Sequence, residues 1–592
     1  MNRETQAHFA QIPSMDISRS KFDRSFIHKT TMNAADLVPI YVDPDIVPGD
    51  TVTMRMSELV RMTTPIVPVM DELSMDIFFF FVPNRLVWDH FKRFMGENDT
   101  APWTQKTEYQ VPQIKIKNSD AYGNKLIRTV LKGSVLDHMG IPTQNSWKIA
   151  GSGTPAEPSR EISISSLPTK AYCLIWNEFF RSEALQNPVD VPKTDSNTDM
   201  KNSNMQAYST DPESFTVSYA YCGGLPPLKV CKTFDYFTAA LPEAQAGPAV
   251  TLPVNGTAPI KWTNEDDPEP DWNNEEAYFK TGPGFITDGS GGTRSGYLTA
   301  PDHMIIGDGN LAHKYPRGKW IDNTPTWQDF TLYADLSSAT GATINALRQA
   351  FAVQKFYERE ARGGQRYIEM VRSHFNVVNP DFRLQRPEYL GGYRHQITIN
   401  QVIQNSESGA TPLGETGAYS LTTHRDGDVF SHSFTEHGIL MGLACIRQTQ
   451  HTYQQGINRA WLKKEKFDFY YPELANLGEQ YIKNEEIYAQ GTSEDTEAFG
   501  YQEAWAEMRY MPDIVSGEMR SDYSQSLDVW HYADNYNELP RLGNKWIRET
   551  DSNVLRTLAV QNQDQFKCDF YFGAIYTRPL PTWSVPGLID HH

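Results

Sequence analysis

The chain has 592 residues, of which 39% are hydrophobic and 12% aromatic, and this apolar content excludes global disorder. Its formal net charge of −19 excludes a surface that attracts polyanions everywhere. The longest uncharged apolar runs, Ile77–Val82 and Ile439–Ile446, are far shorter than the roughly 20 residues of a membrane span, so we expect no membrane insertion. The opening MNRETQAHFAQIP lacks the features of a secretion signal, which predicts synthesis and folding in the cytosol.

The first predicted elements lie before residue 96. Apolar and polar residues alternate over 51–56 at the two-residue period of a half-buried strand. The segment Met75–Val82 holds four consecutive phenylalanines and is followed by proline, which predicts a strand buried on both faces. A short helix is predicted over Val87–Met95, and residues 1–48 are predicted to form an N-terminal arm.

A longer helix and an insertion follow. Lys170–Gln186 lies between Pro168 and Pro188, and because proline does not continue a helix, we predict a helix within these limits. From Gly247 to Phe330 the chain is rich in Pro, Gly, Asp and Asn, with 12 acidic and six basic residues. It has few periodic apolar residues to build a core, so we predict a surface-protruding insertion; a plain surface loop and a functional loop both remain open.

The next helix carries the most informative charge pattern. It is predicted over Thr343–Arg362, before Gly363, inside a segment, 341–400, with nine basic and five acidic residues. Four cations fall within an arc of about 60° on one face of this helix: Arg348, Lys355, Arg359 and Arg362. A fifth, Arg366, follows in the next turn. Clustered arginine is typical of phosphate contacts, so we predict a nucleic-acid contact here. A solvated face paired with Glu358 and Glu360 is the alternative.

Two further strands and three histidines come later. Strands are predicted at Arg394–Ile403 and Lys466–Tyr471. His424, His432 and His437 come nearest to a histidine cluster, but no cysteine accompanies them and their spacing is that of a turn-rich β segment. Structural histidines are therefore favoured, and no metal site is predicted.

Enzyme signatures are missing from the sequence. HExxH, GxSxG, GxxxxGK[ST], paired CxxC and the dinucleotide fingerprint are not found. Residues 473–538 hold 15 acidic and three basic residues, where a glycosidase-like acid and base pair remains open beside a solvent-facing acidic surface. No catalytic or cofactor-binding residue is predicted.

The clearest strand lies near the C-terminus. Phe566, Cys568, Phe570 and Phe572 alternate with polar residues or tyrosine, so the three phenylalanines are predicted to face the core. The 39 glycines and 37 prolines recur at short intervals, as many short strands joined by turns require. The composition therefore favours an all-β sandwich with a few helices.

Several long blocks carry a family resemblance. They are ARGGQRYIEMVRSHFNVVNPDFRLQRPEYLGG at Ala361–Gly392, RSKFDRS at Arg19–Ser25, FDYFTAALPEAQAGP at Phe234–Pro248, TEHGILMG at Thr435–Gly442, FGYQEAWAEMRYMP at Phe499–Pro512, LDVWHYAD at Leu527–Asp534 and the terminal PGLIDHH. Taken in their order along the chain, they resemble the major capsid proteins of gokushoviruses, small tailless bacteriophages of the Microviridae with circular single-stranded DNA. The last residue, His592, departs from the aromatic residue expected there.

The resemblance implies a fold and a role. The fold would be a single eight-stranded antiparallel jelly roll of the viral capsid type, with long loop insertions and a few helices, over residues 49–592. Strands near the two termini would then be neighbours in one sheet. The protein would self-assemble into a T=1 icosahedral shell that encloses single-stranded DNA, with 247–330 presented for host attachment.

The implied partners are other copies of the chain, the packaged DNA, a small basic DNA-binding capsid protein and a host surface receptor. The implied location is the virion, assembled in the cytoplasm of the bacterial host. Residues 1–30 hold five basic and three acidic residues, too few to condense a genome, so the cationic helix is expected to line the inner wall and contact DNA. A carbohydrate-active jelly-roll enzyme or lectin is the alternative, given the aromatic and carboxylate content.

Overall fold

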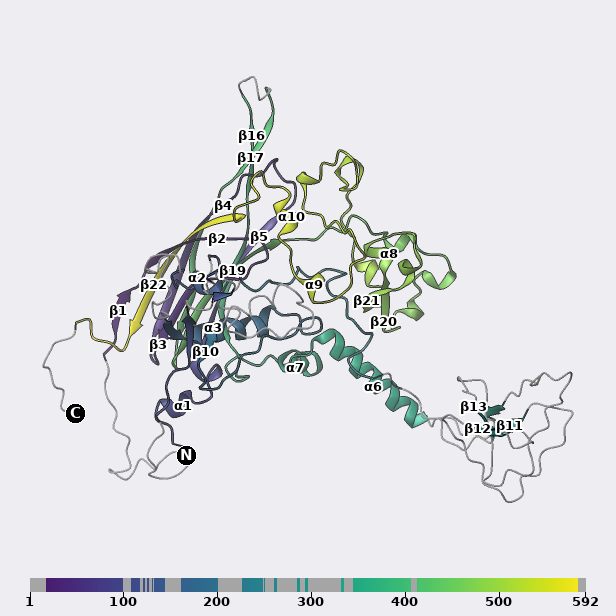
Figure 1. Cartoon of the computed structure of the whole chain (residues 1–592), viewed down its shortest axis with the longest axis horizontal. Coiled ribbons are helices and arrows are strands. Elements are labelled where there is room, and N and C mark those ends of the chain that lie inside the picture. The colour runs from purple at the N-terminus through teal and green to yellow at the C-terminus, as the bar shows by residue number, and fades with distance from the viewer. Residues whose placement is uncertain are drawn as a thin grey trace, which may run out of the picture. The chain divides into compact units, whose positions relative to one another are not determined.

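The chain divides into two compact units, residues 1–249 with 354–592, and residues 250–353. A computed structural model describes residues 18–98, 108–117, 130, 132–143, 161–200, 226–248, 250, 344–405 and 413–583, together with short strands outside these ranges. The first unit contains two large antiparallel sheets (Figure 1).

The first sheet has β4 and β22 at its centre. Its strands are β1 (Ser20–Asp23), β2 (Phe26–Met32), β4 (Thr51–Met62), β18 (Thr422–Ser433) and β22 (Phe566–Arg578). Their order is β1-β22-β4-β18, and β2 pairs with β22 on the same edge as β1. Buried residues recur at every second position of β4 and along most of β22, which confirms the strands predicted at 51–56 and 566–572.

The second sheet has the order β15-β5-β19-β3. Its strands are β3 (Val38–Ile46), β5 (Leu73–Pro83), β15 (Glu388–Gln396) and β19 (Gly438–Gln448). Nearly every residue of β5 is buried, which confirms the strand predicted at 75–82, because layers of the protein cover both faces of this sheet. The predicted N-terminal arm covered residues 1–48, but residues 20–46 contribute β1, β2 and β3 to the two sheets.

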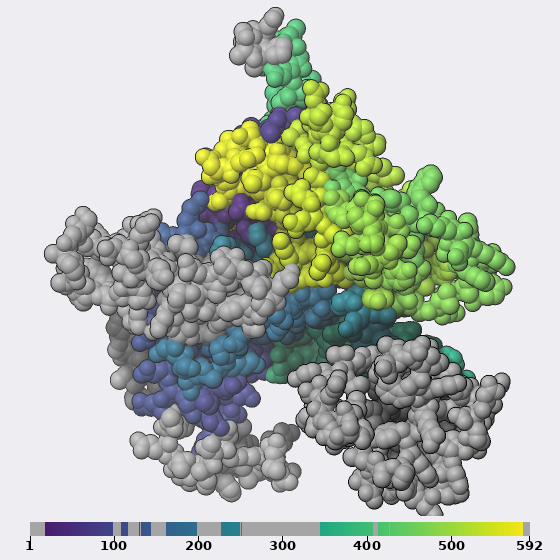
Figure 2. All heavy atoms as spheres, turned by 45° about the vertical axis from the view of Figure 1, so that its right-hand side comes forward, coloured from purple at the N-terminus to yellow at the C-terminus, as the bar shows by residue number. Residues whose placement is uncertain are grey.

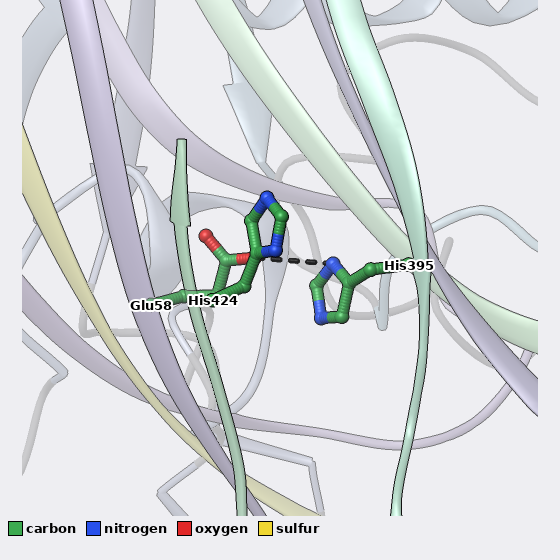
Figure 3. Close-up of side chains that lie close together, drawn as sticks. All are labelled: Glu58, His395 and His424. Carbon is green, nitrogen blue, oxygen red and sulfur yellow. Dashed lines mark ion pairs between the residues drawn. The ribbon is translucent and has the colours of Figure 1, made fainter. Parts of the chain in front are cut away.

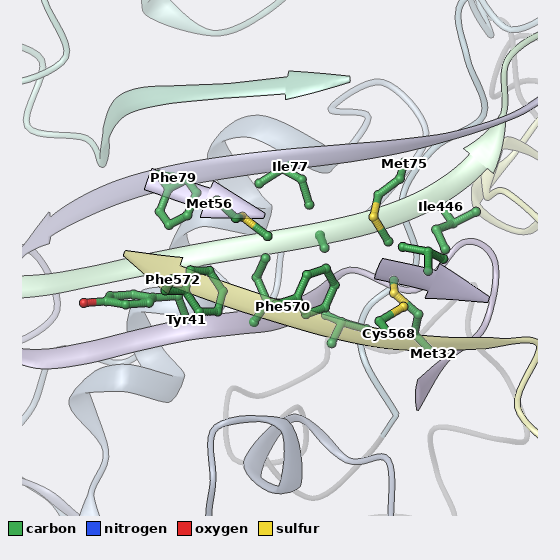
Figure 4. Close-up of a cluster of buried hydrophobic side chains, with 14 of the residues drawn as sticks. Met32, Tyr41, Met56, Met75, Ile77, Phe79, Ile446, Cys568, Phe570 and Phe572 are labelled. Atoms are coloured by element: carbon green, nitrogen blue, oxygen red, sulfur yellow. The ribbon is translucent and has the colours of Figure 1, made fainter. Parts of the chain in front are cut away.

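The sandwich core lies between the inner faces of the two sheets (Figure 4). Phe566, Phe570 and Phe572 of β22 are fully buried there. The ring centroid of Phe572 lies 5.2 Å from that of Tyr41 and 6.4 Å from that of Phe79, both of which come from the other sheet. Aromatic contacts therefore join the two sheets across the core.

A second hydrophobic cluster covers the outer face of the second sheet. It is built from β6 (Gln113–Lys117), β9 (Glu161–Ser165), α1 (Phe91–Phe94), α2 (Val135–His138) and α3 (Leu167–Ile175). The helix predicted over 170–186 begins earlier, because Pro168 lies in its first turn, where proline is tolerated. It ends in the π-helical turn η4 (Trp176–Phe180), after which Arg181 is extended. The helix predicted over 87–95 is also shorter than expected, because only α1, Phe91–Phe94, is α-helical there.

Two long excursions leave the sandwich, at 84–387 and 449–565. The second, light green to yellow in Figure 2, contains β20 (Glu479–Lys483), β21 (Ala498–Glu503), α8 (Asn484–Ile487), α9 (Asn544–Ile547) and α10 (Ser552–Leu555). A third cluster joins the two excursions, for example through Phe237, Tyr453 and Trp546. The strand predicted at 466–471 is wrong: the segment begins as the 3-10 turn η7 (Lys466–Asp468), and its side chains are exposed without a partner strand among the described residues.

A hairpin projects from the sandwich, as Figures 1 and 2 show. It consists of β16 (Ile399–Ile403) and β17 (Thr416–Ser420). The strand predicted over 394–403 is therefore two strands, because β15 stays in the second sheet until Gln396 and β16 then leaves it.

The remaining elements are short apart from one helix. They are β7 (Ala121–Tyr122), β8 (Lys125–Leu126), β10 (Thr198–Met200), β11 (Ile260–Trp262), β12 (Phe285–Thr287), β13 (Thr293–Ser295), β14 (Leu332–Ala334), α6 (Ile344–Gly363) and α7 (Tyr367–Phe375). The helix α6 confirms the one predicted over 343–362. Among the described residues, no helix combines the length and the apolar character needed to cross a membrane.

Candidate nucleic-acid interface

The helix α6 carries four of the five cations predicted to contact nucleic acid, and Arg366 follows it before α7. Its sequence is rich in Ala, Gln, Arg and Glu, which are good helix formers. The helix stops at a glycine pair, where Gly364 adopts a φ of +93°, a left-handed conformation that suits glycine. The boundary between the two compact units falls inside α6, between Val353 and Gln354.

Three of the five predicted cations lie exposed on α6. Arg348, Lys355 and Arg359 are separated by seven and four residues, so they fall on one face of the helix. Within the described ranges none of the three takes part in an ion pair. Their charges therefore face solvent, as a phosphate contact requires.

Arg362 instead bonds to the following excursion. Its Nε donates to Oε1 of Glu479, whose side chain is only 2% exposed, and its Nη1 lies 3.6 Å from Oε1 of Glu503. Burial raises the pKa of Glu479, and the neighbouring guanidinium opposes that rise. Arg362 thus fastens the end of α6 to β20 and β21.

Arg366 is also engaged within the protein. Its Nη1 lies 3.0 Å from Oε2 of Glu183 and 3.2 Å from Oε1 of Glu369, and its Nη2 donates to the carbonyl oxygens of Asn177 and Arg181 at 2.9 Å. These contacts tie the start of α7 to the turn η4. The five predicted residues therefore separate into three exposed cations and two that hold the helices in place.

A second surface was not identified from the sequence. Trp461, Phe467 and Phe469 are 84%, 68% and 53% exposed. Lysines lie over two of these rings: Lys463 Nζ is 5.1 Å from the ring centroid of Phe469, and Lys466 Nζ is 5.7 Å from that of Phe467. Exposed aromatic rings beside cations offer stacking platforms for unpaired bases. The signal available in the sequence is the mixture of lysine and aromatic residues at 461–471, a segment in which only a strand over 466–471 is predicted.

A third cationic site lies on the first sheet, in a cavity of about 500 Å³. Arg61 of β4 stands directly opposite Lys567 of β22, and like charges in this position are destabilising. Lys29 and Lys132 also line the cavity and pair with Asp569 and Asp564, at 3.0 and 3.2 Å. No ion pair of Arg61 or Lys567 occurs within the described ranges, so an anion would stabilise this pair.

The three histidines singled out from the sequence do not meet. His432 Nε2 lies 3.7 Å from Oε2 of Glu388, and the ring of His437 lies 6.0 Å from that of Phe91. His424 belongs to a different group, with Glu58 and His395.

Comparison with known proteins agrees with this architecture. The family described as "Capsid protein (F protein)" matches residues 10–588. Three relatives share the name "Capsid protein VP1". The one from Bdellovibrio phage phiMH2K is 39% identical over 99% of this chain and 98% of its own length.

The relatives from Chlamydia phage 1 and Spiroplasma virus 4 are 35% and 37% identical, each over 98% of this chain and 97% of its own length. The resemblance to gokushovirus capsid proteins seen in the sequence blocks is confirmed. The chain belongs to the capsid protein (F protein) family.

Proposed function

We propose that the chain is the major capsid protein of a small bacteriophage and that it assembles into a T=1 icosahedral shell around circular single-stranded DNA. The observation that carries the proposal is its end-to-end similarity to three capsid proteins, each aligned over at least 97% of its own length. The role is structural and non-enzymatic, and the site of action is the virion, assembled in the host cytoplasm.

We infer that the sandwich is an eight-stranded jelly roll. The strands β1 and β2 pair with successive stretches of one edge of β22, so they count as one strand position. The eight positions along the chain are then β1 with β2, β3, β4, β5, β15, β18, β19 and β22. With this numbering the first sheet has the order 1-8-3-6 and the second has the order 5-4-7-2. Antiparallel sheets of four strands with these non-local neighbours support the jelly roll of viral capsids.

In this proposal the packaged DNA lies against Arg348, Lys355 and Arg359. Their exposure supports phosphate contacts that carry no sequence information. The net charge of −19 leaves most of the DNA charge to counterions and to a small basic capsid protein.

The insertion 247–330 would form the surface protrusion that meets the host receptor. Most of it falls within the separate compact unit 250–353, which supports an appendage that the shell does not need for its own core.

Expression of the full chain in bacteria tests the proposal. We expect particles in negative-stain micrographs that protect single-stranded DNA from nuclease. A soluble monomer that hydrolyses or binds oligosaccharides would instead support the enzyme or lectin alternative.

A further inference from the structure

One charged residue interrupts the core face of β4. Val52, Met54, Met56 and Val60 point into the sandwich and are fully buried, and Glu58 occupies the same face at the same period. The side chain of Glu58 has no exposed surface. A buried carboxylate is costly unless hydrogen bonds and a positive charge compensate it.

Two histidines approach this carboxylate from different strands (Figure 3). His424 of β18 lies directly opposite Glu58 in the antiparallel register of the first sheet. His395 comes from β15 in the second sheet, and its Nδ1 lies 3.1 Å from Oε1 of Glu58. One ligand atom from each of the three side chains lies within 4.8 Å of the other two. The cluster therefore spans the seam where the edge strands of the two sheets meet.

The two imidazole rings lie side by side, with nitrogen atoms that other described side chains do not use. The rings of His395 and His424 are stacked, with centroids 4.9 Å apart and an interplanar angle of 3°. Nδ1 and Nε2 of His395 and Nε2 of His424 are buried and form no hydrogen bond among the described residues. Imidazole nitrogens without a hydrogen-bond partner offer lone pairs to a metal ion.

We propose that Glu58, His395 and His424 bind one divalent transition-metal ion, with Zn²⁺ the best fit, between the two sheets. Two imidazoles and a carboxylate are a common zinc ligand set and leave a fourth position for water. Zinc bonds of about 2.0–2.2 Å put tetrahedral ligand atoms roughly 3.3 Å apart, so the contact between Glu58 and His395 already has the required spacing. The widest pair needs to close by about 1.5 Å at most, and one of the two parallel rings must turn so that both nitrogen lone pairs point at the same ion.

Tyr393 acts as a positioning residue for this site. Its hydroxyl donates to Oε2 of Glu58 at 2.5 Å, on the carboxylate oxygen that does not face His395. Its ring lies 4.9 Å from that of His424. Hydrogen bonds of this kind orient ligating carboxylates and strengthen metal binding.

The ion would close the seam at the base of the projecting hairpin. The strands β15 and β18 are edge strands of different sheets, and β16 and β17 lie between them in the chain. The same base is held by Thr422 Oγ1, which accepts from the Thr398 amide at 2.8 Å, and by Ser420, whose hydroxyl donates to the Thr398 carbonyl. The metal thus fixes the direction in which the hairpin leaves the sandwich.

Zinc content of the purified full-length chain tests the site. After treatment with a chelator and re-equilibration with ZnCl₂, we expect one zinc per subunit by elemental analysis and a higher Tm than in the chelated protein. His395→Gln and His424→Gln should each lose the bound zinc and the Tm shift. His432→Gln, on the same strand as His424 but more exposed, is the matched control and should retain both.

A second measurement does not depend on the folding of core variants. X-ray absorption at the zinc edge of the wild-type protein should show imidazole nitrogen and oxygen ligands at about 2.0–2.2 Å. Tyr393→Phe should weaken zinc binding by about tenfold or more. The proposal is overturned if folded wild-type protein takes up no zinc, if both glutamine variants retain it, or if the spectrum lacks imidazole ligands.

Discussion

Lys232 and Asp534 form an ion pair deep in the protein, where the second excursion meets the first. Lys232 Nζ lies 2.6 Å from Oδ2 of Asp534, and both side chains are 4% exposed. Asn553 donates to the other carboxylate oxygen, and the ammonium lies 4.7 Å from the ring centroid of Trp546. Each charge is compensated only while its partner is present.

Asp534→Asn should therefore lower the free energy of unfolding by about 3–5 kcal/mol, because Lys232 would be left as a buried, uncompensated cation. Denaturant unfolding of the subunit measures the change. Asp428→Asn breaks the exposed pair with Arg55 and should cost no more than about 1 kcal/mol. Similar losses in the two variants would contradict this account.

The same carboxylate predicts an acid sensitivity. Burial alone would raise the pKa of Asp534, but Lys232 and the hydrogen bond from Asn553 outweigh it and lower the pKa to about 2. Because this folded-state value lies below the ordinary value of 3.8, the stabilisation is present above pH 4 and is lost as the pH falls toward 2. Calorimetric Tm values should drop over this range, and the drop should be smaller in Asp534→Asn.

Phe570 tests the core contribution of β22. Phe570→Ala removes a fully buried ring and should cost about 3–5 kcal/mol, which yields insoluble subunits at growth temperature. Lys567→Ala, on the opposite face of the same strand, should change stability by less than about 0.5 kcal/mol. Normal particle yield from Phe570→Ala would contradict the role of this ring.

At the scale of elements, the predictable strands and helices were those whose own sequence shows either a regular period or a continuous apolar run. β4, β5, β22 and α6 each carry their own pattern of apolar residues, so no knowledge of distant partners is needed. The segment 466–471 has a similar alternation but no sheet edge to join, and its aromatic side chains remain exposed. Alternation alone is therefore not sufficient for a strand, because pairing with a neighbouring strand decides the outcome.

The group of Glu58, His395 and His424 was not predictable from spacing. Glu58 lies more than 300 positions before the two histidines. Strand register places His424 opposite Glu58, and the packing of the two sheets brings His395 to them. The only local sign was a glutamate at a core position of β4. Likewise, nothing in the sequence showed that Arg362 and Arg366 pair with carboxylates while the three other cations, on α6, are exposed.

That difference makes α6 testable as a DNA-contacting element. Replacing Arg348, Lys355 and Arg359 with Gln should leave particles intact, lower their DNA content and flatten the slope of log affinity against log salt by about 2, since each lost phosphate contact contributes about 0.7. Arg362→Gln removes one cation from the same helix but should mainly loosen its attachment to β20. Unchanged DNA content in the triple variant would refute the contact.

At the scale of the whole molecule, the separate unit of residues 250–353 predicts that shell assembly and host attachment depend on different parts of the chain. Deleting the insertion 247–330 and joining the ends with a Gly/Ser linker should preserve shell assembly, because the core clusters lie in the other unit. Attachment of the resulting particles to host cells should fall. Micrographs and a cell-binding assay distinguish the two effects, and folded subunits that no longer assemble would count against separability.

The central position of β22 affects how the protein is made. This strand lies between β2 and β4, and its residue Asp569 pairs with Lys29, 540 positions earlier. On the ribosome the first sheet therefore stays open, with the facing edges of β2 and β4 unpaired, until residues 566–578 have emerged from the exit tunnel. A product of interrupted translation would expose these unpaired strand edges and would aggregate or be degraded. Because of this strand order, a chain truncated before β22 cannot complete the first sheet, and we expect only full-length subunits to enter a shell.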